Sequence, residues 1–304
     1  MDDSMSTLLC QENVTFLEGA FGDEEYPFIP LHEYGVFSED EYIAILIERE
    51  ISFGFKKDES YVLENWIKCA RADVINWILK TRATLGFHFQ TAYLSVTYFD
   101  RFLSKRSIDN GKYWSIWLLS VACISLAAKM EEYHVPLLSE FQLENHCFEN
   151  KVIQRMELLV LSTLEWNMNI VTPLDFLPYF TTKLCNKPPP SNILSKTMEP
   201  ISILMKEVNL MDHRPSVMAA TATLVALDQQ LTMEAIGLKM SSIIHQYTFL
   251  DHKDIFACYN LIKGLYKEKT RRNKLVHSSS PSSPKRRRFT FNDDKESCDG
   301  KKLP

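Results

Sequence analysis

Glycine is scarce in this sequence, with only 9 glycines among 304 residues. Phosphate-binding loops and the regularly spaced turns of β-sandwiches both depend on glycine, so its scarcity disfavours a nucleotide-binding enzyme and an all-β fold. Closely paired cysteines are also missing, because the seven thiols are scattered: Cys10, Cys69, Cys123, Cys147, Cys185, Cys258 and Cys298. This pattern argues against a disulfide framework and a zinc site, and it predicts the reduced thiols of a cytosolic or nuclear protein.

Basic residues are absent from positions 1–15, which argues against a secretory signal peptide. A long membrane-spanning run is missing as well. The most apolar stretch, WSIWLLSVACISLAA at residues 114–128, has 15 residues, whereas roughly 20 are needed to cross a bilayer. It is apolar on nearly every side of a helix and ends in KMEE, residues 129–132. We therefore expect this stretch to form the central helix of a helical bundle.

The formal net charge of −5 conceals two strongly charged ends. Residues 1–65 carry 16 acidic and 3 basic side chains, a net charge of −13, whereas residues 263–288 carry 1 acidic and 10 basic side chains, a net charge of +9. Such asymmetry indicates terminal segments with functions of their own. Residues 1–37 and 271–304 show no periodic pattern, so we expect both segments to be disordered.

Between these ends, apolar residues recur at the spacing of helices, and we find no strand pattern. Ser38 followed by three acids predicts a helix start, and Thr172-Pro173 with Asp175 predicts a stronger one at a domain boundary. We expect an all-α fold of two tandem domains, residues 38–171 and 172–270, with about five helices each and an additional N-terminal helix. The expected helices include approximately residues 38–53, 113–130, 150–164, 192–210, 215–230, 237–246 and 252–270, and a short one starting at Val135-Pro136.

Four charged residues interrupt the apolar helix patterns of the first domain: Arg71, Asp100, Lys129 and Glu157. Burying an unpaired ion is costly, so such residues must be paired or lie at a helix end. Periodicity alone favours salt bridges that serve only the domain itself, with no partner outside it.

A longer pattern gives these residues a second interpretation. The stretches RADVINWI at residues 71–78 and SVTYFDRF at 95–102, with the residues between them, resemble the cyclin-box signature over 32 positions without a departure. LLSVACISLAAKMEE and VIQRMELLVLSTLEWNM resemble two further cyclin-box helices, so the resemblance covers most of residues 40–170. The second half resembles the C-terminal cyclin box only in its helix layout and in its start at Thr172-Pro173.

The resemblance implies two tandem cyclin boxes that bind a cyclin-dependent kinase and reposition its mobile helix. It places the family's kinase-contacting lysine and glutamate at Lys129 and Glu157, and it places the ion pair that braces the box at Arg71 and Asp100. Neighbouring residues are implied to lie in the same kinase interface: Leu126, Met130, Glu131 and Glu132. Such a protein activates a kinase without chemistry of its own, and the resemblance implies no cofactor.

Many cyclins also carry a substrate-docking patch on the first box helix, and the matching positions here are Ala70, Val74 and Trp77. The family's patch usually begins with a larger residue such as methionine, and Ala70 departs from that pattern. Val74 and Trp77 fit a helix core equally well. Docking and a purely structural role both remain open at these three positions.

The stretch LLCQE, residues 8–12, lies in the acidic N-terminal segment. In an extended chain Leu8, Cys10 and Glu12 point to the same side, so they can enter one groove together. By itself so short a motif can be accidental. Together with a cyclin box it resembles the retinoblastoma-pocket motif of D-type cyclins, and the KMEE box end and the overall length resemble the plant D-type group. The resemblance implies a retinoblastoma-like pocket protein as a partner.

The C-terminal segment contains a basic cluster, Lys285, Arg286, Arg287 and Arg288. Such a cluster is typical of a nuclear localisation signal, although solvated charge and an isolated nucleic-acid patch are alternatives. Ser280 and Ser283 each precede a proline and are candidate phosphorylation sites, where phosphates would offset the adjacent positive charge. We therefore expect a nuclear protein with a cytoplasmic pool.

We interpret the chain as the activating subunit of a cyclin-dependent serine/threonine kinase that promotes the G1/S transition by directing the kinase to a pocket protein. Kinase-inhibitor proteins are further expected partners, and no nucleic acid, membrane, metal or cofactor is expected. One rival is a cyclin-fold transcription-factor module that binds DNA or the transcription machinery. Such modules carry basic boxes and often a zinc ribbon, whereas the basic charge here is confined to the C-terminal end. A second rival is an enzyme, for which we recognise no catalytic constellation.

Overall fold

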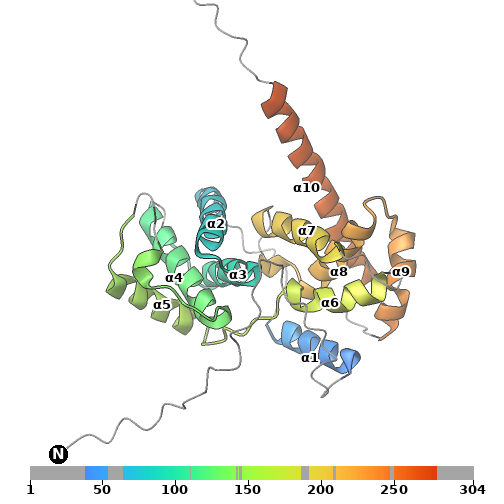
Figure 1. The fold of residues 1–304 in the computed structure, drawn as a ribbon, viewed down its shortest axis with the longest axis horizontal. Coiled ribbons are helices and arrows are strands. Elements are labelled where there is room, and N and C mark those ends of the chain that lie inside the picture. The colour runs from blue at the N-terminus through green and yellow to red at the C-terminus, as the bar shows by residue number, and fades with distance from the viewer. Residues whose placement is uncertain are drawn as a thin grey trace, which may run out of the picture.

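A computed structural model describes residues 38–53, 64–109, 111–141, 143, 146–185, 192–207, 210–246 and 250–278. Across these ranges the chain forms helices joined by loops and short 3-10 turns, without a strand (Figure 1). The helices are α1 (Glu39–Ser52), α2 (Asn65–Leu85), α3 (Phe89–Lys105), α4 (Tyr113–Glu131), α5 (Asn150–Thr163), α6 (Pro173–Leu184), α7 (Ile193–Glu207), α8 (Pro215–Leu227), α9 (Met233–Gln246) and α10 (His252–Ser278). This architecture confirms the all-α fold class.

Helix α4 forms the centre of the first group of helices, which also contains α2, α3 and α5. Twelve of the 19 residues of α4 are buried, and they cover all sides of the helix. Length and composition alone would allow α4 to cross a membrane, but 67% of its most apolar window is buried inside the protein. Helix α4 contacts α2, α3 and α5, so it is the central helix of this group. Its uniformly apolar sequence predicted this position.

Helix α8 plays the same part in the second group, which contains α6 to α10. Its residues from Pro215 to Val225 are all buried, and α6, α7 and α10 pack around it. The proline opens the helix at a position where its missing N–H costs nothing. The two groups lie side by side in Figure 1, each around its own apolar helix.

The second group begins with the helix start that the sequence predicted at Thr172. The carboxylate of Asp175 accepts a hydrogen bond from the N–H of Thr172 at 2.7 Å, and Pro173 occupies the first helical position of α6. The hydroxyl of Thr172 lies 3.0 Å from Oε1 of Gln90 on α3, so the start of α6 is tied to the first group. The start of α1 shows the other predicted cap, in which Glu41 Oε2 accepts from the N–H of Ser38 at 2.8 Å.

Helix α1 packs against α6 and α8 rather than against the first group, although it precedes that group in sequence (Figure 1). Its Glu50 is buried and accepts hydrogen bonds from the N–H of Ser216 at 2.6 Å and from its hydroxyl at 2.7 Å. Glu50 therefore satisfies two donors at the start of α8. Burial raises the pKa of the Glu50 carboxyl, and the two hydrogen bonds only partly oppose that rise.

Three helix boundaries differ from the sequence predictions. No α-helix starts at Val135, because Pro136 disfavours a helical conformation in the residue before it, and only a single 3-10 turn follows at Leu138–Glu140. Helix α9 starts at Met233 instead of near residue 237. Helix α10 ends at Ser278, so residues 271–278 are helical and not part of a disordered tail. These residues contain strong helix formers and no glycine or proline, so nothing in them stops the helix.

Candidate functional site

The candidate site starts at the end of α4, where Lys129 meets Glu157 of α5. The ammonium of Lys129 lies 2.6 and 2.7 Å from the two carboxylate oxygens of Glu157, and the Ser125 hydroxyl donates to the same carboxylate at 2.6 Å. The side chain of Glu157 is only 8% exposed, whereas that of Lys129 is 43% exposed. The structure therefore brings the two predicted residues together, with the lysine at the surface and the glutamate held behind it.

Exposed apolar side chains follow Lys129 along the chain. We call this region the α4–α5 surface, and its members are Lys129, Met130, Tyr133, Val135, Leu137 and Leu158. Tyr133 and Leu137 are the most exposed of them, at 78% and 71%. Leu158 lies on α5 next to Glu157 and is also exposed. Several exposed large apolar residues in the stretches that follow the two charged residues are typical of a protein-binding surface.

Two predicted members of this interface lie elsewhere. Leu126 is 6% exposed and packs in the hydrophobic core. The carboxylate of Glu132 points inward, accepting from the N–H of His88 at 2.8 Å and from the hydroxyl of Thr91, and its side chain is 7% exposed. Glu132 thus satisfies donors at the start of α3, where a negative charge is favoured. Both side chains make contacts within the domain itself, and their part in a kinase interface stays a prediction.

Glu131, the last residue of α4, has an unusual pKa for a side chain at the surface. Partial burial of its carboxyl and the nearby negative charges of Asp175 and Glu132 raise its pKa to about 7, while His88 acts in the opposite direction. The charge at the edge of the α4–α5 surface therefore changes within the physiological pH range.

The Arg71–Asp100 pair is buried and joins the two groups of helices. The Arg71 Nε lies 2.7 Å from Asp100 Oδ1, and its Nη2 donates to Asp100 Oδ2 at 2.8 Å. The same guanidinium donates to the carbonyls of Met205 at 3.1 Å and Lys206 at 3.2 Å near the end of α7. Asp100 also accepts from the N–H of Leu210 at 3.1 Å. Burial opposes the charge of Arg71, but the ion pair outweighs it and raises its pKa.

The predicted docking patch is not exposed as a patch. Ala70 and Val74 are buried, with 7% and 0% exposure. Trp77 is half-buried and packs edge-on against Trp117 of α4, with ring centroids 6.3 Å apart. Burial favours the structural alternative for Ala70 and Val74, and docking at these three positions stays an untested prediction.

The remaining predicted sites lie outside the described residues and stay predictions. They are Leu8, Cys10 and Glu12 of the N-terminal motif, Ser280 and Ser283, and the basic cluster at Lys285, Arg286, Arg287 and Arg288. Within the described part of the chain, no group of three histidine, cysteine, aspartate or glutamate residues could hold a metal ion.

Sequence reasoning missed Tyr133, Leu137 and Ser125. The apolar Leu137 in VPLL carries the signal of a core residue, and only the fold shows that it faces outward. A serine inside an apolar helix gives no sign that it will donate to a glutamate 32 positions away. The signal that could have identified the surface is the abrupt change from the apolar helix to YHVP, since a proline there prevents the chain from burying these side chains in a further helix.

Comparison with known proteins gives matches to both halves of the chain. Residues 41–169 match the family model of the cyclin N-terminal domain, and residues 171–294 match that of the cyclin C-terminal domain.

Among curated proteins, Cyclin-D5-1 of Oryza sativa subsp. japonica is 43% identical over 64% of this chain and 54% of its own length. Cyclin-D5-1 of Arabidopsis thaliana is 33% identical over 97% of this chain and 95% of its own length. The chain thus spans just over half of the rice relative. Among solved structures, a viral cyclin from herpesvirus saimiri has a TM-score of 0.58 at 16% identity, covering 74% of this chain and 96% of the viral chain. That likeness shows a shared fold.

Proposed function

The chain belongs to the cyclin family and is similar to its plant D-type members, and from that premise we propose that it is the activating subunit of a cyclin-dependent serine/threonine kinase. The observation that supports this proposal is the α4–α5 surface, in which exposed Tyr133 and Leu137 follow Lys129 within eight residues of the chain and exposed Leu158 follows Glu157 directly. A charged pair beside exposed apolar side chains provides both the orientation and the burial that a specific interface requires.

The mechanism follows from what a kinase needs. Its catalytic lysine must pair with a glutamate of the mobile αC helix before ATP is positioned for transfer. A rigid partner that binds that helix in its active position shifts the kinase towards the active state by its preference for that state. Lys129 contributes three donors at the end of a buried helix, and Glu157 fixes the direction in which they point. The chain itself performs no chemistry in this scheme.

Two equally exposed leucines provide a sharp test. Leu137 lies in the α4–α5 surface and is 71% exposed, whereas Leu238 lies on α9 and is 77% exposed. We expect Leu137→Asp to weaken binding to a cyclin-dependent kinase at least tenfold, since burying a leucine contributes about 1.5–3 kcal/mol and tenfold corresponds to about 1.4 kcal/mol. Leu238→Asp should leave binding unchanged. Equal losses in the two variants, or no loss in either, would exclude this surface as the kinase interface.

We further propose that the motif at Leu8, Cys10 and Glu12 directs the kinase to a retinoblastoma-like pocket protein and thereby promotes entry into S phase. Tethering a substrate raises its effective concentration near the active site to the millimolar range for a short flexible connection. Cys10→Gly should therefore reduce phosphorylation of a pocket-protein fragment and leave phosphorylation of an untethered peptide unchanged. Equal rates on the pocket-protein fragment for the variant and the original chain would contradict a targeting role.

We also propose that Lys285, Arg286, Arg287 and Arg288 direct the protein to the nucleus, with phosphorylation at Ser280 and Ser283 weakening import and maintaining a cytoplasmic pool. Phosphates next to the cluster would reduce its net positive charge. Aspartate at both serines should lower the nuclear fraction of the full chain, and alanine at both should raise it. The same nuclear fraction in both variants would refute the phosphorylation switch.

A further inference from the structure

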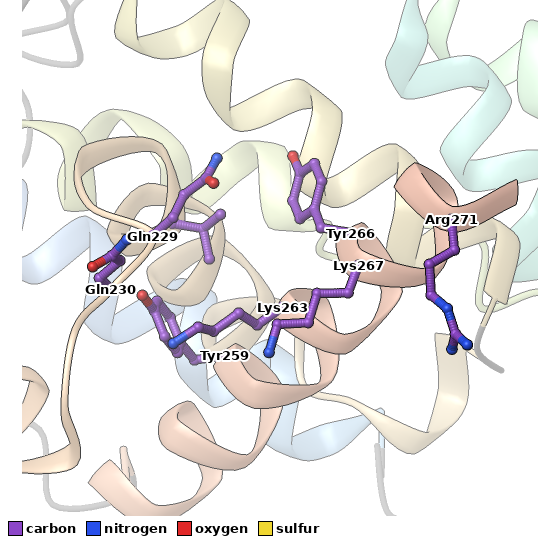
Figure 2. A pocket seen from close by; sticks show the side chains of 8 residues that line it. Gln229, Gln230, Tyr259, Lys263, Tyr266, Lys267 and Arg271 are labelled. Atoms are coloured by element: carbon purple, nitrogen blue, oxygen red, sulfur yellow. The ribbon is translucent and has the colours of Figure 1, made fainter. Parts of the chain in front are cut away.

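A basic groove lies between the α8–α9 loop and one face of α10, in the second group of helices. It is open and has a volume of about 840 Å³, and its lining combines basic and polar side chains with the apolar surface of Val225, Tyr259 and Tyr266 (Figure 2). We define this basic groove by six of its lining residues: Gln229, Gln230, Tyr259, Lys263, Lys267 and Arg271. The proposed function does not use it.

Three of these residues form a row of cations along α10. Lys263, Lys267 and Arg271 are separated by four positions each, so they share one helix face and follow one another at about 6 Å intervals along the helix axis. Within the part of the chain that the structure describes, none of the three forms an ion pair. Lys269, which faces away from this row, is instead paired with Glu199 of α7 at 2.9 Å.

The floor and the opposite wall of the groove are held in place. The buried ring of Tyr259 lies under Lys263, with the ammonium 5.6 Å from the ring centroid. Its hydroxyl accepts from the N–H of Leu231 and donates to the carbonyl of Asp228, each at 2.9 Å, which fixes the loop carrying Gln229 and Gln230. The amides of these glutamines can bond to the backbone of a bound peptide.

We propose that the basic groove binds the acidic residues 23–25 of this chain's own N-terminal segment. Residues 1–37 contain eight acidic side chains and no lysine or arginine, and three of the acids are consecutive at Asp23-Glu24-Glu25. Alternate side chains of an extended strand point the same way and lie about 6.7 Å apart. Asp23 and Glu25 therefore match the interval of about 6 Å between neighbouring cations of α10.

The stretch between the acidic residues and α1 has a long reach. Thirteen steps separate Glu25 from Ser38, and they span at most about 45 Å. A domain of about 100 residues, with a radius of gyration near 13 Å, is only about 35 Å across. The segment also starts from the correct domain, because α1 packs on α8, whose end forms part of the groove. An intramolecular contact of this kind needs little intrinsic affinity, since the effective concentration is high.

A single-stranded nucleic acid fits the groove less well than an acidic peptide. Such strands are bound by stacking their bases on exposed aromatic rings. The ring of Tyr259 is buried beneath Lys263, so the half-buried Tyr266 is the one lining ring that is partly exposed (Figure 2). A single partly exposed ring cannot stack a succession of bases, whereas the three cations and the two glutamine amides suit an acidic peptide.

Carbodiimide cross-linking of the full chain tests the contact directly, because the reagent joins carboxylates only to lysine amines within reach. We expect links from residues 23–25 to Lys263 or Lys267, and few to the exposed Lys68 and Lys151 of the first group. The Arg271→Glu variant keeps both reactive lysines, yet it should lower these links at least fivefold. Salt at about 0.5 M should act similarly, since it screens charges beyond a few ångströms.

The matched control is Arg155→Glu, which changes the net charge equally at an exposed position of α5 and should leave the links unchanged. Cross-linking a mixture of isotopically light and heavy chains distinguishes links within one chain from links between two chains. Links within one chain support the proposal. Links between chains would show a second copy in the groove, and links mainly to Lys285 would place the acidic segment on the C-terminal basic cluster; either result overturns the proposal. No kinase enters the test, so its outcome is independent of the proposed function.

Discussion

Replacing Arg71 by methionine should destabilise the protein more than any surface change, because it removes one half of a buried ion pair. The side chains of Arg71 and Asp100 are 7% and 1% exposed. Removing one partner of such a pair costs about 3–5 kcal/mol, since the remaining charge is left without compensation. That is a large share of the roughly 5–15 kcal/mol by which a domain is stable. We therefore expect Arg71→Met to lower the free energy of unfolding by about 4 kcal/mol.

Urea unfolding followed by tryptophan fluorescence and by circular dichroism can report on the two groups of helices separately. All five lie in the first group, between Trp66 and Trp166, so their fluorescence reports that group, while circular dichroism reports all helices. Arg71 also donates hydrogen bonds to the carbonyls of Met205 and Lys206 at 3.1 and 3.2 Å, so its loss should weaken the coupling between the unfolding of the two groups. In urea, the two signals should change together for the original chain and at different midpoints for Arg71→Met.

Two further variants decide whether the reasoning is correct. Arg71→Met/Asp100→Leu removes both charges, so it should be about 2 kcal/mol more stable than Arg71→Met alone, although backbone groups remain unpaired. Arg155→Met, at an exposed position of α5, should change stability by less than about 0.5 kcal/mol. A cost below about 1 kcal/mol for Arg71→Met, or a double variant as unstable as the single one, would refute the account of a clamp between the boxes.

The remaining predictions concern two glutamates. Glu50→Ala should lower the free energy of unfolding by about 1–3 kcal/mol, because two donors of Ser216 lose their acceptor. The control Glu48→Ala, at an exposed position of the same helix, should have little effect. Equal urea midpoints for the two variants would contradict this role of Glu50. The pKa of Glu131 is raised from 4.5 to about 7 in the folded protein, so its contribution to stability is complete below pH 4.5 and is lost as the pH rises through 7. Glu131→Gln should therefore flatten the decline of the urea midpoint between pH 5 and 7.5, and an unchanged slope would show that this carboxyl titrates normally.

Local signals predicted the elements that local forces determine. The run at residues 114–128 is apolar on all sides, and it could only be a central helix, as α4 is. The start of α6 was predictable because Thr172, Pro173 and Asp175 act within one turn. The end of α10 was missed, since lysines and arginines that resemble a disordered tail are also good helix formers in the absence of glycine or proline.

Contacts between distant segments could not be predicted from the sequence. The cyclin-box resemblance placed Arg71 beside Asp100, but nothing near Arg71 indicates a bond to a carbonyl 134 positions away. The resemblance also placed Glu132 in the kinase interface, whereas the structure turns its carboxylate towards His88 because unpaired donors at the start of α3 lie within reach. Whether a side chain faces solvent depends on how distant segments pack against it, and neighbouring residues in the sequence do not determine that packing.

The turnover of a cyclin-dependent kinase on a pocket-protein fragment, measured with and without this chain, tests the central claim most directly. The account predicts that the chain activates the kinase, that Leu137→Asp abolishes activation on every substrate while Leu238→Asp does not, and that Cys10→Gly reduces activity on the pocket-protein fragment alone. Failure of the chain to bind or activate any kinase in a broad panel of cyclin-dependent kinases would contradict the account.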